Sequence, residues 1–267
     1  MKFTDLFKSP KPLIGCIHLM PLPGAPRYSG NIQNVYETAL SEVDIFKRHP
    51  VDGFIVENFR DMPFYPTNLP AETVASLAAV TREIVKASDV PVGVNALRND
   101  AQAALAIATA AEAHFIRVNV HMHAVVSDQG LLQGASHETL RLRAALKSSV
   151  LIFADVGVKH SVPLGERSLA AETRDVTERG LADALIVSGE STGSETKIDE
   201  LDIVRQNTDL PTLVGSGVTA ANLPTFYTKA DGLIVGSDFK TDAKADNLVE
   251  EARVKAFTEK LKSLQSS

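Results

Sequence analysis

The sequence predicts an α/β fold, a single-domain (β/α)8 TIM barrel, and three observations lead to this fold class. The chain has 267 residues, a length typical of one such barrel. Eight short apolar runs rich in β-branched residues alternate with segments of helical character. Six consecutive runs end in a side chain that can bind a ligand or transfer a proton, as strands do at the catalytic face of a barrel.

Each of the eight runs has the uninterrupted apolar character of a parallel strand that is buried on both faces. In chain order the runs span residues 13–19, 52–58, 90–97, 114–120, 150–156, 183–189, 211–217 and 231–237. An open doubly wound sheet would usually show fewer units and an early glycine-rich turn, so the barrel is the better prediction.

Helices are expected between the strands. Residues 73–88 carry apolar side chains at helical spacing, residues 100–113 are rich in alanine, and the charged segment 247–264 is typical of a closing helix. Pro and Gly fall at unit junctions and form no linker, so residues 1–267 are predicted to form one domain. Two connections are longer than the usual 4–6 or so residues and are expected to form loops over the catalytic face: 21–31 and 121–136.

Composition and charge narrow the class of protein. Hydrophobic residues make up 44% and charged residues 22%, as in soluble globular domains. The net charge of -6, with no basic block, argues against nucleic acid or an anionic membrane as a partner.

The single Cys16 excludes an internal disulfide and is expected to be a small buried hydrophobe. No apolar run approaches the roughly 20 residues of a membrane span, and no export signal is present, so we predict a cytoplasmic protein. Homo-oligomers are compatible with this composition.

Ionisable side chains at the predicted strand ends are candidates for catalysis. His18, Glu57 and Asp155 are expected to converge on one cavity, where they could transfer protons or hold one divalent metal ion. Lys159 follows the fifth strand and could neutralise an anionic substrate or transition state, although a solvated loop position fits it equally well. The sequence therefore leaves proton transfer and metal binding open at this cavity.

Polar and basic side chains at the same strand ends are candidates for substrate binding: Asn58, Asn95, Arg117, Asn119 and Ser188. Taken singly, Asn and Ser at such positions are equally typical of turns and helix caps. Arg117 fits a substrate anchor and an internal salt bridge equally well. His121 and His123 form an HxH pair, which we interpret as exposed loop residues in preference to a metal site.

The loops after the last two strands favour phosphate. They contain Gly215, Ser216 and Gly217 after the seventh strand, and Gly236 and Ser237 after the eighth. Glycines let backbone N–H groups approach a phosphate closely, and a following helix adds a positive dipole end. Barrel enzymes frequently hold phosphate at these two loops. A tight turn alone would explain one such loop, but the pair favours phosphate, and the small-residue segment 188–193 could complete the site.

Long uninterrupted motifs across nearly the whole chain closely resemble the BtpA/SgcQ family. They include IHLMPLPGAPRYSG (17–30), GVNALRNDAQAALAIA (93–108), ADVGVKH (154–160), LVGSGVTAANL (213–223) and DGLIVGSDFK (231–240). The resemblance implies a TIM barrel related to ribulose-phosphate-binding barrels. The family takes its name from a cyanobacterial protein needed to accumulate photosystem I, which implies assembly as an alternative role. His123 stands where the family is expected to have a smaller residue, often Gly.

Together these observations predict an enzyme that acts on a phosphorylated sugar or nucleotide-like small molecule, as an isomerase, a lyase or an enzyme that cleaves a glycosidic bond. Two alternatives stay open: a non-catalytic assembly or regulatory factor of the BtpA type, and a hydrolase that depends on a divalent metal. A scaffold does not need ionisable groups at its strand ends, so the enzyme is the preferred hypothesis.

Overall fold

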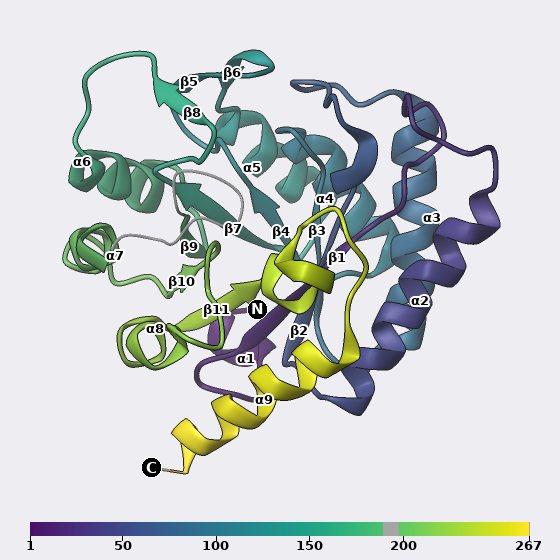
Figure 1. The fold of residues 1–267 in the computed structure, drawn as a ribbon. Helices are drawn as coiled ribbons and strands as arrows, with labels where there is room; N and C mark the ends of the chain where they lie inside the picture. Colours follow the sequence, from purple (N-terminus) through teal and green to yellow (C-terminus); the bar gives the residue numbers. More distant parts are fainter. Residues whose placement is uncertain (189–197, 267) are drawn as a thin grey trace.

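Eight parallel strands close into a barrel in the computed structural model, which describes residues 1–188 and 198–266 (Figure 1). The strands are β1 (Leu13–His18), β2 (Gly53–Glu57), β3 (Val92–Asn95), β4 (Phe115–Val118), β7 (Leu151–Val156), β9 (Ala184–Val187), β10 (Thr212–Val214) and β11 (Gly232–Val235). They pair in chain order, and β11 pairs with β1 to close the ring. Each strand lies inside one of the predicted runs, so the predicted fold class is confirmed.

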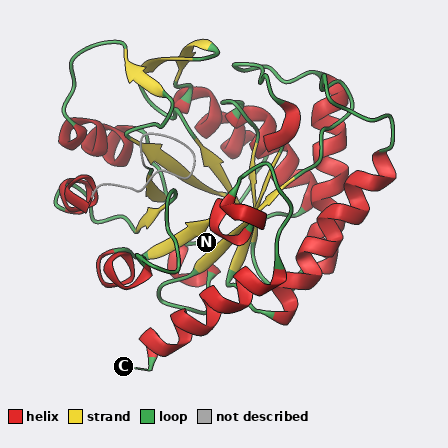
Figure 2. Ribbon diagram, viewed as in Figure 1, coloured by secondary structure: helices red, strands yellow, loops and turns green. Residues whose placement is uncertain are grey.

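Helices surround the barrel (Figure 2). They are α2 (Ile32–Arg48), α3 (Ala71–Ala87), α4 (Ala101–Ala111), α5 (Ser136–Ala145), α6 (Leu169–Arg174), α7 (Ile198–Arg205), α8 (Leu223–Lys229) and α9 (Glu251–Gln265). Helix α4 begins where Asp100 accepts the N–H of Ala103 at 2.9 Å and ends where Glu112 turns left-handed. Such caps satisfy the backbone groups that a helix terminus leaves without partners.

The apolar core has two parts, one inside the barrel and one between the strands and the helices. Ile55, Phe115 and Phe153 belong to the inner part. The short helix α1 (Phe3–Leu6) closes the amino-terminal end of the barrel, with the Phe3 ring 5.6 Å from that of Phe153. Side chains thus fill the lower barrel, and in this fold ligand sites lie at the carboxyl-terminal ends of the strands.

A three-stranded antiparallel sheet covers part of that face where the sequence predicted a long loop over 121–136. Its strands are β5 (Ala124–Ser127), β6 (Gly130–Gln133) and β8 (Ser161–Pro163), with β5 in the centre. Val125 and Leu132 turn inward and pack in a small apolar cluster separate from the barrel core. The prediction missed this hairpin because each strand is only four residues long. We call the sheet the roof.

The chain crosses the barrel mouth before its last helix. Helix α9 begins at Glu251, later than the predicted start at residue 247, because the preceding segment turns back and pairs Val249 with Lys240. Val249 donates its N–H to a Glu42 carboxylate oxygen at 3.0 Å and forms a β-bridge with Lys240. Across residues 1–188 and 198–266, no helix combines the length and the apolar character that crossing a bilayer requires.

Candidate functional site

A layer of buried polar side chains lies across the carboxyl-terminal end of the barrel. Strand register places His18 level with Glu57 and Glu57 level with Asn95, so neighbouring strands present these groups at one height. The layer joins six residues that the sequence singled out, each at most 5% exposed: His18, Glu57, Asn95, Arg117, Asp155 and Ser188. The strand ends therefore meet in one layer, but Asp155 lines a different cavity from His18 and Glu57, so the single cavity predicted for these three residues is not observed.

Arg117 is the centre of this layer. Its Nε and Nη2 donate to the two oxygens of Asp155 at 2.9 and 3.0 Å, and Nη2 also donates to Ser188 Oγ at 3.3 Å. Glu57 Oε1 lies 3.6 Å from Nη1. Burial lowers the pKa of Arg117, but the charges of Asp155 and Glu57 outweigh burial, so the net pKa is raised. Asp155 is therefore held as the counter-ion of Arg117, and Asn119 Nδ2 donates to the same carboxylate at 2.8 Å.

Glu57 and His18 face each other beside Arg117. Asn95 Nδ2 donates to Glu57 Oε1 at 2.9 Å, while Glu57 Oε2 lies 3.5 Å from His18 Nε2. His18 Nδ1 is 2.9 Å from the carbonyl oxygen of Ala245, which can only accept, so this nitrogen carries the proton. Burial, and then the charge of Lys240, hold the pKa of His18 well below its ordinary value. His18 is therefore neutral and presents the lone pair of Nε2 to the space beside Glu57.

Lys159 reaches the same space from the loop after β7. The side chain is partly buried, and its ammonium forms no hydrogen bond or salt bridge with a described residue. Burial and the charge of Arg117 lower its pKa to about 8. Of the two sequence interpretations of Lys159, the structure favours the one that places a cation at the barrel mouth.

The glycine-rich loops after β10 and β11 form the opposite side of this space. At Gly215 a Cβ atom would lie 2.4 Å from Ile186 Cγ2, so any larger residue would clash with that side chain, while it would only touch Arg117 Nη2 at 3.4 Å. Gly217 has φ +68°, a conformation that glycine adopts without strain. The Ala220 N–H donates to Asp238 at 3.0 Å and so ties the two loops together.

Backbone donors in these loops are available to a ligand. Within the described part of the chain, the N–H groups of Gly217, Val218 and Ser237 donate to no protein acceptor. Helix α8 begins only at Leu223 and is seven residues long, so its terminus supplies none of these donors. The loop backbone, and not a helix end as the sequence analysis expected, would therefore contact an anion.

One small cavity joins the two sides. Its walls combine the ionisable groups with the glycine-rich loops: His18, Glu57, Arg117, Lys159, Gly215, Ser216, Gly217, Gly236 and Ser237. Its volume of about 30 Å³ is far below the roughly 300 Å³ of usual ligand pockets, so a ligand that bound here would have to move these side chains or loops apart.

Asn58 does not join this cavity. Its Nδ2 donates to Asp61 at 3.1 Å, and its Oδ1 accepts the Leu97 N–H at 2.8 Å. The amide thus fastens the end of β2 to the segment after β3. The small-residue segment 188–193 that the sequence suggested as part of a phosphate site lies, from residue 189 on, outside the described residues.

The structure gives little geometric support to the metal alternative. In the described residues, no group of three or more His, Cys, Asp or Glu side chains is arranged to hold a metal ion. Glu57 and Asp155 instead share Arg117, which places a positive charge between them. His121 and His123 also diverge: His121 bonds the Gly180 carbonyl at 2.8 Å, and His123 lies 3.3 Å from Asp175.

Sequence reasoning missed one group that shapes the site. Arg60 donates to the backbone carbonyls of His18, Asp246 and Asn247, and so holds the segment whose Ala245 carbonyl orients His18. Arg60 lies in a short 3-10 helix (Phe59–Asp61), outside any predicted strand end. Two of its three partners are backbone oxygens 186 and 187 residues away, which no side-chain pattern indicates.

The fold and this polar layer define a (β/α)8-barrel protein with a candidate ligand site at the carboxyl-terminal face. Residues 9–263 match the model of the BtpA family, and the chain belongs to that family. An uncharacterized protein of Thermococcus kodakarensis is 44% identical over 96% of this chain and 97% of its own length. The photosystem I biogenesis protein BtpA of Synechocystis sp. is 40% identical over 97% of this chain and 91% of its own.

A solved structure agrees in fold. The N-(5'-phosphoribosyl)anthranilate isomerase of Pyrococcus furiosus superposes with a TM-score of 0.56 and 14% identity, covering 95% of this chain and 99% of its own. At this level of identity the similarity establishes the barrel, and it carries no residue roles.

Proposed function

We propose that the protein is an enzyme that acts on a phosphorylated sugar or nucleotide-like small molecule, with the phosphate held by the loops after β10 and β11. One observation carries the proposal: a single cavity is lined by these loops on one side and by His18, Glu57, Arg117 and Lys159 on the other. Backbone N–H groups and cations favour a phosphate, and acid–base groups across the cavity face the rest of the molecule.

Each side chain has a role that its contacts support. The N–H groups of Gly217, Val218 and Ser237 bind phosphate oxygens, and Lys159 adds a positive charge. Glu57 Oε2 and His18 Nε2 lie 3.5 Å apart, and both accept hydrogen bonds. A substrate hydroxyl beside the pair could donate a hydrogen bond to one of these two groups and then transfer its proton to that group. Asp155 and Asn119 position Arg117, whose charge stabilises an anion that develops at this point.

A thermal-shift screen tests the proposal. We expect ribose 5-phosphate and other sugar phosphates or nucleotides to raise the melting temperature, while the corresponding unphosphorylated sugars and nucleosides do not. Addition of divalent metals to the same screen tests the hydrolase alternative. Once a substrate is found, Glu57→Gln should abolish turnover and retain binding. Turnover equal to that of the parent would contradict the assignment of Glu57.

A second candidate function is a role in assembly, because the Synechocystis relative is named as a photosystem I biogenesis protein. The roof presents four exposed apolar side chains that a partner protein could cover: Val126, Leu131, Val162 and Leu164, at 46%, 53%, 67% and 62% exposure. Affinity capture with the parent and with a variant carrying serine at Val162 and Leu164 tests this role. A specific partner that only the parent retains would favour assembly.

A further inference from the structure

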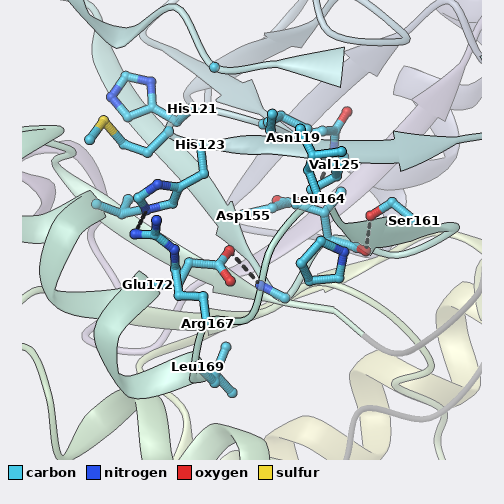
Figure 3. Close-up of a pocket in the computed structure, with 18 of the residues that line it drawn as sticks. Asn119, His121, His123, Val125, Asp155, Ser161, Leu164, Arg167, Leu169 and Glu172 are labelled. Carbon is cyan, nitrogen blue, oxygen red and sulfur yellow. Dashed lines mark hydrogen bonds between the residues drawn. The ribbon is translucent and has the colours of Figure 1, made fainter. Parts of the chain in front are cut away.

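A second and larger cavity, of about 890 Å³, lies beside the barrel mouth under the roof (Figure 3). This volume is within the range of sites that bind small organic molecules. Asn119, Asp155 and Ser188 line its inner wall, while Val125 of β5 and Pro163 of β8 line it from the roof. Figure 3 shows His121 and His123 on one side of the cavity and Ser161 and Leu164 on the other.

The large cavity adjoins the candidate phosphate site through side chains that bond one another. Asp155 and Ser188 line the large cavity, and both bond Arg117, which lines the small one. These contacts form the wall between the two cavities, so a molecule that occupied both would have to pass beside this wall.

Two residues that line the large cavity each have a buried atom without a hydrogen-bond partner among the described residues: Asn119 Oδ1 and His121 Nδ1. Asn119 Nδ2 donates to Asp155, so the unpartnered atom is the amide oxygen, an acceptor. His121 Nε2 faces the Gly180 carbonyl and so carries the proton, which leaves Nδ1 as an acceptor. Burial also lowers the pKa of His121, which keeps the ring neutral. Buried acceptors without donors are rare in proteins. Each of the two atoms has less than 1 Å² of accessible surface, so a ligand that donates hydrogen bonds would meet them after the Asn119 and His121 side chains turn toward the cavity.

The remaining wall disfavours an anion. Arg167 is the only Arg or Lys among the described residues that line the cavity, and it is paired with Asp175 and His123. The Glu172 carboxyl group faces the same space and accepts the Gly157 N–H at 3.1 Å. Apolar side chains complete the lining: Val125, Val158, Leu164, Leu169 and Val176. An uncharged group with one apolar face suits this wall better than a second phosphate would.

We propose that the large cavity binds the non-phosphate part of the substrate, an uncharged group whose hydroxyl or N–H donors reach Asn119 Oδ1 and His121 Nδ1. This inference rests on the proposed function for its phosphate anchor. It adds a binding site for the rest of the molecule, under the roof and outside the small cavity.

Titration calorimetry with inorganic phosphate, ribose 5-phosphate and AMP tests the inference. Ribose 5-phosphate or AMP should bind at least tenfold more tightly than inorganic phosphate. Asn119→Leu and His121→Phe, which remove the acceptors and keep the approximate volumes, should each weaken that compound about tenfold. His121→Phe, which leaves the bond between Asn119 and Asp155 intact, should leave inorganic phosphate unchanged. If ribose 5-phosphate and AMP both bind more tightly than inorganic phosphate, the hydrogen-bond donors are hydroxyl groups. If only AMP binds more tightly, the donors are N–H groups.

Val126→Ser is the matched control, because this roof side chain is 46% exposed and does not line the cavity. It should bind every compound as the parent does. Equal affinity of the parent for all three compounds, or parent-like binding by both cavity variants, would overturn the inference while leaving the phosphate site in place. Failure of the parent to bind any of the three would overturn the proposed function itself.

Discussion

Arg117 contacts three other members of the buried polar layer through its guanidinium: Asp155, Ser188 and Glu57. Replacing it by methionine keeps much of the volume but leaves Asp155 buried without its counter-ion. Loss of one partner from a buried pair costs about 3–5 kcal/mol. We therefore predict that Arg117→Met lowers the free energy of unfolding by about this amount, as measured by urea denaturation.

The double variant Arg117→Met/Asp155→Leu is the control, since it removes both charges. Its free energy of unfolding should recover most of the loss, because apolar replacements of a buried pair are often tolerated. If the free energy of unfolding of Arg117→Met alone lies within about 0.5 kcal/mol of that of the parent, the Asp155 carboxyl group does not depend on Arg117 as its partner.

Lys159 should give phosphate binding a pH dependence. Its pKa of about 8 means that it is charged below this pH and neutral above it. A sugar phosphate is already dianionic there, with a second pKa of about 6. We therefore predict that the affinity for ribose 5-phosphate falls as pH rises through about 8, measured by calorimetry from pH 7 to 9.5.

Two variants separate this effect from other titrations. Lys159→Met should bind more weakly at pH 7 and lose the pH dependence, whereas Lys159→Arg should stay charged throughout and bind evenly up to pH 9.5. The same inflection in Lys159→Met would assign it to a different group.

The sequence could predict the residues of the layer better than their contacts. Glu57 and Asp155 were identifiable because each ends an apolar run, and strands of a closed barrel end at one face. The pairing of Asp155 with Arg117 was not predictable, since the barrel stagger decides which side chains meet. The orientation of His18 was also beyond the sequence, because it depends on a backbone carbonyl from a distant segment.

At the scale of elements, α1 stabilises the barrel from the end opposite the candidate site. Phe7, at its carboxyl end, is 7% exposed and lies 6.1 Å from Phe115 and 6.5 Å from Phe153, ring centre to ring centre. We predict that Phe7→Ala lowers the free energy of unfolding by about 3–5 kcal/mol, as for other buried aromatic truncations. Affinity for ribose 5-phosphate should stay unchanged under conditions where the variant is folded. Weaker binding of ribose 5-phosphate by the folded variant would show that the amino-terminal end of the barrel influences the candidate site at the other end.

Elements differ in how strongly the sequence specifies them. The barrel strands and α4 follow from continuous apolar runs and from high helix propensity in 101–111. Helix α1 was missed because four residues are too few for a helical period to show. The roof was missed for a related reason. Its central strand β5 pairs with β8, which is distant in sequence, and this pairing, not local preference, stabilises the short strands.

For the whole molecule, the depressed pKa of His18 links folding to pH. The folded state holds this ring neutral, while the unfolded chain protonates it near its ordinary pKa of 6.5. The unfolded state therefore binds more protons below pH 6.5, and the stability contributed by neutral His18 is lost as pH falls below this value. Between pH 7.5 and 5.5 the free energy of unfolding should fall, by up to about 1.4 kcal/mol per pH unit from this group.

His18→Gln isolates the contribution, because the amide can still donate to Ala245 but does not titrate. Its free energy of unfolding should depend less steeply on pH than that of the parent over the same interval. Parallel curves for the two proteins would show that His18 is charged in the folded state or solvated in the barrel mouth.

The central claim is that a phosphate binds at the loops after β10 and β11, and calorimetry with ribose 5-phosphate on two variants of Gly236 tests it most directly. A Cβ at Gly236 meets no atom closer than 3.5 Å, so the backbone position admits a side chain, and Asp and Asn share one shape there. Gly236→Asp places a negative charge in the loop, and Gly236→Asn places a neutral side chain of the same shape. We predict that Gly236→Asp binds at least tenfold more weakly than Gly236→Asn. Equal binding by the two folded variants would contradict a phosphate site at these loops.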